Sequence, residues 1–257
     1  MKNKKLMWIA VFLIVAVTLV ITVGTKDSQS QEKDTSNLAN PTPDGNGFKD
    51  RSKYAVADYD ELLPSDISAS TQRKMTNSRY DGQDWVLRKP DPNDSGVGRE
   101  DEKQPPSATP VAESGLIIVG EITDSKAHMS NDKLGVYTEF TIRVSKILKN
   151  DVDKNLVSGG LVTVDREGGY VLYPNGQKVF YENSNRALPQ LGSEYMFFLS
   201  ADKQSPNYNI LTLYEFQNNR IGRLDYVSNK NEFKDATPVI FEQAIRDKIL
   251  QFSKSPK

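Results

Sequence analysis

One uninterrupted apolar segment near the start of the chain constrains its topology more than any other feature. The 18 residues from 6 to 23 carry no charge, and three lysines, Lys2, Lys4 and Lys5, precede them. An α-helix of this length spans roughly 27 Å, close to the hydrocarbon thickness of a bilayer. A cleaved signal peptide is the alternative, but its apolar core usually covers about 7–15 residues and ends at an Ala-x-Ala-like site.

We therefore expect a cytoplasmic tip and an uncleaved transmembrane helix over residues 1–25. The lysines stay on the cytoplasmic side, so the rest of the chain is exported to the periplasm or the cell exterior. Secretion after cleavage of the segment is the alternative localisation. Through the uncleaved helix, the membrane is the first partner that the sequence predicts.

Composition excludes several kinds of site. The 257 residues include no cysteine and a single histidine, His128. Disulfides, thiolate metal sites and thiol nucleophiles are thereby excluded, as is any site that needs two imidazoles. The formal net charge of −1 lacks the basic excess of a nucleic-acid-binding domain, so no nucleic-acid partner is expected. No nucleotide-binding, serine-hydrolase or zinc-protease motif occurs, and no cofactor is expected.

Residues 26–110 are predicted to be a mostly disordered exported linker. From 26 to 53 the apolar residues are Leu38, Ala39 and Phe48, too few to offset the entropy of an unfolded chain. A partly ordered arm is expected at 54–88, because tyrosine, leucine, isoleucine and tryptophan side chains return there.

Within the arm, Ser65 or Asp66 is predicted to cap a short helix that runs to Lys74. Residues 85–87, Trp-Val-Leu, are expected to form a strand or hook that packs on the later domain. A partner-binding peptide is the alternative interpretation of the arm.

Residues 111–228 are predicted to form a β domain. Between Val136 and Ser145 apolar and polar residues alternate, so one face of that strand is buried and the other faces water. The connections are short and rich in turn formers, and Pro174-Asn175-Gly176 is the clearest hairpin signal. The expected fold is mainly β, a small antiparallel barrel of OB-like type or a sandwich. Strands are predicted at 115–123, 136–145, 161–166, 170–173, 178–182, 194–200, 208–216 and 221–227.

Residues 229–257 are predicted to contain one helix and a tail. Thr237 is a suitable N-cap, and Pro238 suits the first helical position. The helix is expected to pack on the β domain as a lid, with a partner-binding surface as the alternative. Its predicted apolar face consists of Phe241, Ala244, Ile245, Ile249 and Phe252.

Three segments carry a resemblance to known proteins: Gly115-Leu-Ile-Ile-Val-Gly-Glu-Ile-Thr123, Val136-Tyr-Thr-Glu-Phe-Thr-Ile-Arg-Val-Ser-Lys-Ile-Leu-Lys149 and Gly192-Ser-Glu-Tyr-Met-Phe-Phe-Leu199. In this order they resemble uncharacterised exported bacterial proteins built on a small β-barrel. The first two are also similar to the OB-like barrel of netrin-type and metalloprotease-inhibitor domains. Those inhibitors act through a cysteine-led wedge that this chain lacks. The resemblance, over residues 116–216, therefore implies a fold and not an activity.

The segment 124–132 is expected to be a loop and contains the first candidate site. His128 is accompanied there by Asp124 and Asp132, and these three are candidate metal ligands. His128 is also a candidate general base. The alternative is an ordinary polar loop, in which Asp, Ser and Asn serve as turn formers.

The second candidate site is Asp165-Arg166-Glu167, which precedes two glycines. Along a strand Asp165 and Glu167 share one face and Arg166 takes the other. The two carboxylates suit an acid/base pair or a ligand clamp, and a solvated hairpin tip is the alternative. Tyrosines on the wet face of a small barrel can bind sugars or peptides, although they also serve as core or cover. The candidate ligand-binding residues are Tyr137, Tyr170, Tyr173 and Arg166.

Together these features predict a non-enzymatic module that binds a protein or glycan of the cell envelope. The alternative is a small metal-dependent or carboxylate-based hydrolase of envelope polymers, with His128, Asp165 and Glu167 as catalytic residues. A third possibility is an assembly subunit that donates a strand from 54–88. The enzyme predicts a pocket that brings His128 near Asp165, the binding module a stripe of exposed tyrosines, and the subunit an open sheet edge.

Overall fold

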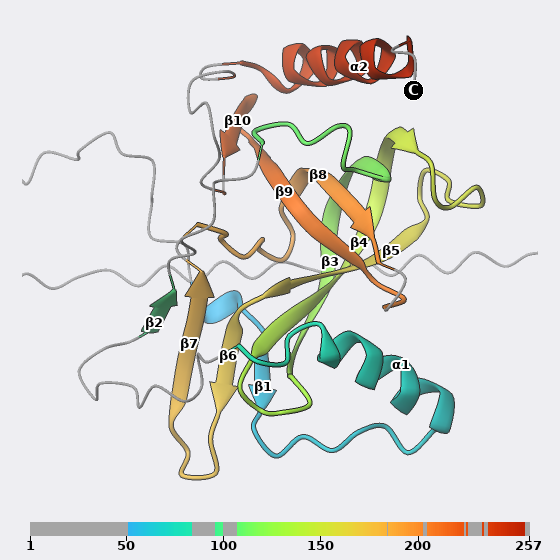
Figure 1. Ribbon diagram of the computed structural model, residues 1–257. Coiled ribbons are helices and arrows are strands. Elements are labelled where there is room, and N and C mark those ends of the chain that lie inside the picture. The colour runs from blue at the N-terminus through green and yellow to red at the C-terminus, as the bar shows by residue number, and fades with distance from the viewer. Residues whose placement is uncertain are drawn as a thin grey trace, which may run out of the picture. The chain divides into compact units, whose positions relative to one another are not determined.

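The computed structural model describes residues 51–83, 96–99, 107–183, 185–202, 205–223, 225, 233 and 236–254. All of them belong to one compact unit, Phe48–Lys257 (Figure 1). The apolar segment 6–23, the linker up to residue 50 and the expected hook at 85–87 lie outside the described residues. Within those residues, no helix combines the length and the apolar character that crossing a membrane requires.

The described chain is mainly β, as predicted, and its larger sheet has six strands in the order β10-β9-β5-β4-β3-β8. β9 also pairs with β8. The five strands β3, β4, β5, β9 and β8 therefore form a closed cycle in which each strand pairs with two of the others. The β5–β9 pair is parallel, and the other pairs of this sheet are antiparallel. The strands are β3 (Leu116–Met129), β4 (Val136–Asn150), β5 (Leu161–Glu167), β8 (Glu194–Ala201), β9 (Tyr208–Gln217) and β10 (Arg220–Arg223).

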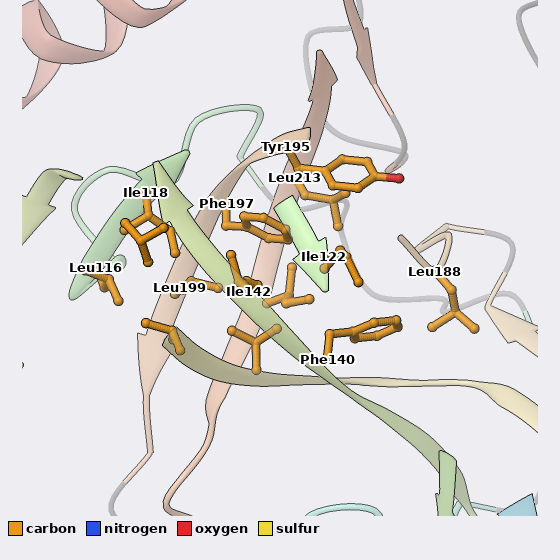
Figure 2. Packing of buried hydrophobic residues seen from close by; sticks show 14 of the residues in the cluster. Leu116, Ile118, Ile122, Phe140, Ile142, Leu188, Tyr195, Phe197, Leu199 and Leu213 are labelled. Atoms are coloured by element: carbon orange, nitrogen blue, oxygen red, sulfur yellow. The ribbon is translucent and has the colours of Figure 1, made fainter. Parts of the chain in front are cut away.

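The main core lies inside these paired strands. The period-2 alternation of each strand sends every second side chain inward, and Figure 2 shows Ile122, Ile142 and Phe197 converging there. Each fully buried side chain of this size contributes about 1.5–3 kcal/mol relative to its exposed state. The inward residues of the strands therefore hold the sheet in its curved shape.

A smaller sheet of four strands has the order β1-β6-β7-β2. β6 and β7 form the predicted hairpin, whose turn places Gly176 at a φ of 81°, where a side chain would be strained. β1 belongs to the arm and pairs with β6 in parallel, so the arm is part of the folded unit. The strands are β1 (Val56–Asp58), β2 (Gly96–Arg99), β6 (Gly169–Leu172) and β7 (Lys178–Asn183).

The prediction of a loop over residues 124–132 is wrong for residues 124–129. β3 continues to Met129, and His128 pairs with Tyr137 of β4. Ala127 and Met129 are buried against the smaller sheet, which supplies the apolar partners that a strand needs at this point. The turn between β3 and β4 is therefore confined to 130–135.

Both predicted helices are present. α1 (Ile67–Ser78) begins after Asp66, whose carboxylate accepts a hydrogen bond of 2.8 Å from the Ala69 amide, and it ends four residues later than Lys74. A short 3-10 helix, η1 (Arg51–Lys53), precedes β1.

α2 (Pro238–Lys254) follows Thr237, whose hydroxyl accepts from the Ile240 amide at 3.4 Å. Phe241 and Ile245 are buried on the outer face of the larger sheet, against residues of β3, β8 and β9. Phe252, which was expected on the same face, stays exposed. Figure 1 shows α1 and α2 at different ends of the compact unit.

Candidate functional site

The outer surface of β4 and β5, with the end of β3, brings together most of the residues that the sequence singled out. The register places Glu139 opposite Asp165, Tyr137 opposite Glu167, and His128 opposite Tyr137. Directly opposed residues of an antiparallel pair share a face, so all five side chains lie on one surface. We call these five residues the β4–β5 face.

The two arginines of the arm bind carboxylates of this face. Nη1 of Arg73 lies 3.0 Å from Oε1 of Glu139. Nη1 of Arg79 lies 2.5 Å from Oδ1 of Asp165, and its Nε lies 3.2 Å from Oδ2 of Asp202 in the β8–β9 connection. Burial works against the charge of Arg79, but the negative charges of Asp165 and Asp202 outweigh it and raise the arginine's pKa. The arm thus supplies two cations to an acidic surface.

Aromatic and amide groups complete the contact between the arm and the face. The ring of Tyr80 stacks on that of Tyr137, with centroids 4.4 Å apart and planes at 7°. The Tyr137 hydroxyl donates to Oδ1 of Asn77 at 2.7 Å and accepts from Arg73 at 3.0 Å. The Tyr80 hydroxyl donates to Oδ1 of Asp165 at 2.7 Å. Tyr137 is therefore buried and engaged and does not form an exposed platform.

His128 is buried between two carboxylates. Its Nδ1 lies 3.0 Å from Oε2 of Glu61, which belongs to the arm, and its Nε2 lies 3.6 Å from Oε2 of Glu139. Burial tends to raise the pKa of Glu61, but the hydrogen bond and charge of His128 lower it overall. The histidine thus links the loop before α1 to β4.

The expectation of a solvated tip at Asp165-Arg166-Glu167 is wrong, because Asp165 and Arg166 are buried. Burial raises the pKa of Asp165, and the neighbouring Arg79 opposes the rise. Oδ2 of Asp165 has no hydrogen-bond partner among the residues that the structure describes. Glu167 accepts from Asn183 at 2.5 Å. The charges at this strand end are therefore placed by tertiary contacts and not by solvent.

Arg166 points to the other side of β5, as alternation predicts. Its two terminal nitrogens bind both carboxylate oxygens of Asp225, at 2.6 and 2.8 Å. Nη1 also donates to the carbonyl of Ala187 at 2.9 Å. Arg166 is thus held inside the domain and does not join the other candidate ligand-binding residues.

Tyr170 and Tyr173 lie in and just beyond β6 and do not join Tyr137. Tyr170 packs on Phe180, with ring centroids 4.8 Å apart. The Tyr173 hydroxyl lies 2.5 Å from that of Tyr181. The three candidate tyrosines therefore do not form the stripe that a tyrosine platform requires.

The candidate metal ligands are separated. Asp124 precedes His128 by four residues on one strand, a distance of about 13 Å. Asp132 lies in the β3–β4 turn and accepts from the Gly82 amide and the Ser130 hydroxyl, both at 2.6 Å. In the described part of the chain, no three His, Asp or Glu side chains are grouped so that they could hold a metal ion.

A hollow of about 140 Å³ opens between the loop before α1 and the β3–β4 turn. Its walls include Leu62, Leu63 and Met129 together with the polar Arg73 and Lys133. His128 and Asp165 do not line it. The pocket that the enzyme hypothesis predicts is therefore not formed here.

Sequence reasoning missed the arm residues Glu61, Arg73, Asn77, Arg79 and Tyr80. One signal was present: the helix carries Arg73 and Lys74 but no acidic residue, so its cations lack the local partners that helices usually provide. Comparisons with known proteins add no identification, since no protein-family model and no curated protein matches the chain.

Proposed function

We propose that this protein is a non-enzymatic interaction module of the bacterial envelope, anchored in the membrane by residues 6–23. Its β domain is an OB-like barrel, and the β4–β5 face is its recognition surface. The natural ligand of this surface is a polypeptide. The single observation that carries the proposal is that this face already binds two arginine side chains through its carboxylates.

The strand pairings support the barrel. Five strands whose pairings return to the start, with one parallel pair, match the five-stranded Greek-key arrangement of OB folds. Such barrels bind ligands on their second and third strands and on two flanking loops. The corresponding parts here are β4, β5 and the β3–β4 and β8–β9 connections.

The arm contacts each of these parts. Besides the two arginine–carboxylate pairs, Asn131 of the β3–β4 turn donates to the carbonyl of Lys74 at 3.0 Å. The hydroxyls of Thr76 and of Ser205, in the β8–β9 connection, lie 3.1 Å apart. Charged and polar contacts of this kind provide specificity and orientation, as in protein–protein recognition.

A hydrolase receives less support from the geometry. Asp165 and His128 are buried beneath the arm, and Glu167 is bound to Asn183. A catalytic acid or base must come within hydrogen-bond reach of its substrate. These three side chains instead have partners from the protein itself.

Site-specific photo-crosslinking in the membrane-bound full chain tests the proposal. A photoreactive residue in place of the exposed Lys126, beside Glu139 in the register, is expected to capture a discrete envelope partner. The same residue in place of the exposed Gln243 on α2 is the matched control and should not capture it. Equal capture from both positions, or an envelope-polymer hydrolysis that His128→Ala abolishes, would contradict the proposal.

A further inference from the structure

We infer that α1, together with the two residues that follow it, Arg79 and Tyr80, is an exchangeable occupant of the β4–β5 face. The partner is an arginine-bearing helical segment of another polypeptide. The inference rests on the proposed function and specifies the chemistry of the ligand. The occupant seen in the structure supplies the pattern: an arginine, a second arginine six residues later, and an aromatic residue directly after it, as in Arg73, Arg79 and Tyr80.

The first support is the way in which α1 is attached. Of its 12 residues the buried ones are Thr76 and Asn77, both polar. Ile67 is 84% exposed and Met75 is 40% exposed. A helix that belongs permanently to a core normally buries a stripe of apolar side chains. α1 and the two residues after it are held by ion pairs, hydrogen bonds and one stacked tyrosine pair, which an equivalent segment can replace.

The second support is that α1 leaves its receptor partly unfilled. Arg79 binds Asp165 through Oδ1, while Oδ2 is buried without a hydrogen-bond partner among the described residues. A guanidinium that approaches the carboxylate side-on forms two parallel hydrogen bonds and a stronger pair. A helix in trans that presents its arginine in this way would satisfy Asp165 better than α1 does.

The third support is charge. The arginines that neutralise Glu139 and Asp165 both come from the arm, and Arg79 also binds Asp202. Displacement of α1 would expose an acidic surface, which repels anionic lipid headgroups and attracts a cationic polypeptide. The partner is therefore a basic polypeptide segment and not a membrane surface.

α1 and the face that it occupies belong to the same chain, and this covalent connection sets the conditions of the test. An occupant joined to its receptor by a short flexible linker acts at an effective concentration in the millimolar range. A free peptide competes poorly against such a tether. The experiment must therefore compare chains whose α1 is locked, natural or weakened.

The chain contains no cysteine, so an engineered pair forms the only disulfide. The double variant Thr76→Cys/Ser205→Cys replaces two hydroxyls that lie 3.1 Å apart and, when oxidised, locks α1 on the face. The probe is a fluorescent peptide of residues 61–83, and a copy with both arginines replaced by glutamine is its control. Wild-type protein under the same redox conditions controls for effects of the reductant.

We expect the reduced full-length double variant to bind the probe and the oxidised form to bind it at least about tenfold more weakly. The full-length variant Arg73→Gln/Arg79→Gln should bind the probe more tightly than wild type, because its own arm competes less. The glutamine peptide should bind none of these proteins. Circular dichroism melts of each variant establish that the β domain is folded.

Equal binding to the locked and reduced forms, or no binding to the arm-weakened variant, would overturn the inference. Disulfide-linked dimers of the double variant would also overturn it, because the occupant would then be a second copy of this chain. If the peptide test fails while the photoreactive residue at position 126 still captures a partner, the proposed function stands and the arm is a fixed part of the domain. If the peptide test succeeds while that residue captures no partner, the envelope role is contradicted, but the binding of arginine by the β4–β5 face is not.

Discussion

At the scale of single residues, Tyr137 joins the arm to the β domain. Its hydroxyl donates to Asn77 and accepts from Arg73, while Tyr80 stacks on its ring. Burial is the main cause of its raised pKa, so the hydroxyl stays neutral and keeps its proton for Asn77. The hydrogen bond to Asn77 depends on this proton.

Removing that hydroxyl should weaken the attachment of the arm. Tyr137→Phe leaves the buried side-chain Oδ1 of Asn77 without its donor, and we expect the free energy of unfolding to fall by about 1–2 kcal/mol. Tyr170→Phe is the control, because the Tyr170 hydroxyl makes no hydrogen bond within the described residues, and its effect should stay within about 0.5 kcal/mol. Urea titration of both variants measures the difference, and equal losses would contradict the role given to Tyr137.

Arg166 and Asp225 form a buried ion pair. Removing one partner should lower the free energy of unfolding strongly, whereas replacing both with apolar residues should lower it much less. Arg166→Met alone leaves the carboxylate of Asp225 uncompensated, and we expect a loss of about 3–5 kcal/mol in unfolding free energy. The double variant Arg166→Met/Asp225→Leu should recover most of that loss, since neither charge remains. If the double variant were as unstable as the single one, the pair would have a role beyond charge compensation.

The Glu61–His128 contact makes a pH-dependent contribution to stability. The pKa of Glu61 is lowered in the folded state, so its contribution is present above the unfolded pKa, near 4.5, and is lost as pH falls through the folded pKa. Because Glu61 is partly exposed, the effect should be below about 1 kcal/mol.

The raised pKa of Asp165 acts with the opposite sign, since its contribution is present at low pH and is lost as pH rises through its folded pKa. Asp165 is present in both wild type and Glu61→Gln, so its contribution cancels when the unfolding free energies of the two proteins are compared. We expect the difference in unfolding free energy to be present at pH values above the unfolded pKa of Glu61, near 4.5, and to vanish under acid conditions. A difference that grew as pH fell would contradict the assignment.

At the scale of elements, local patterns predicted well what local forces determine. The alternation in β4, the hairpin turn at Gly176 and the caps at Asp66 and Thr237 all depend on near neighbours in sequence. The second half of β3 was missed because its residues 124–126 are polar and partly or fully exposed, which resembles a turn. Its burial depends on the smaller sheet, whose packing leaves no local pattern.

The candidate site divides in the same way. His128, Tyr137, Asp165 and Glu167 could be found from residue type and strand alternation. Their partners in the arm lie about 60–90 positions away in sequence, and a single chain shows no pattern for such pairs. Sequence reasoning therefore found one side of the contact. Of the other side it predicted a partly ordered arm with a short helix, but not the residues that bind the face.

α2 should depend on one aromatic anchor. Phe241 is buried, and its ring centroid lies 4.6 Å from that of Tyr214 and 4.7 Å from that of Phe233. We expect Phe241→Ala to cost about 3–5 kcal/mol, measured by denaturant unfolding, because it leaves a cavity beneath the helix. Val239→Ala, at a position 75% exposed on the same helix, is the control and should change little. A small effect of Phe241→Ala would mean that α2 is not part of the cooperative unit.

At the scale of the whole molecule, the domain combines two kinds of attachment. The strands of the larger sheet and α2 are joined by buried apolar side chains. α1 and the two residues that follow it are joined to the same domain by arginine–carboxylate pairs and one stacked tyrosine pair. Elements with few buried apolar contacts open locally, well below the free energy of global unfolding. The fold is thus organised so that the acidic face can be uncovered while the domain stays folded.

Hydrogen exchange of the full-length protein tests this claim most directly. We predict that the α1 amides exchange through local opening, much faster than the core amides of β3 and β4. Arg79→Gln should speed exchange in α1 by about tenfold and leave β4 unchanged, because it removes the bonds to Asp165 and Asp202. If α1 were as strongly protected as β3 and β4, the arm would be a permanent part of the core and the exchangeable face would be refuted.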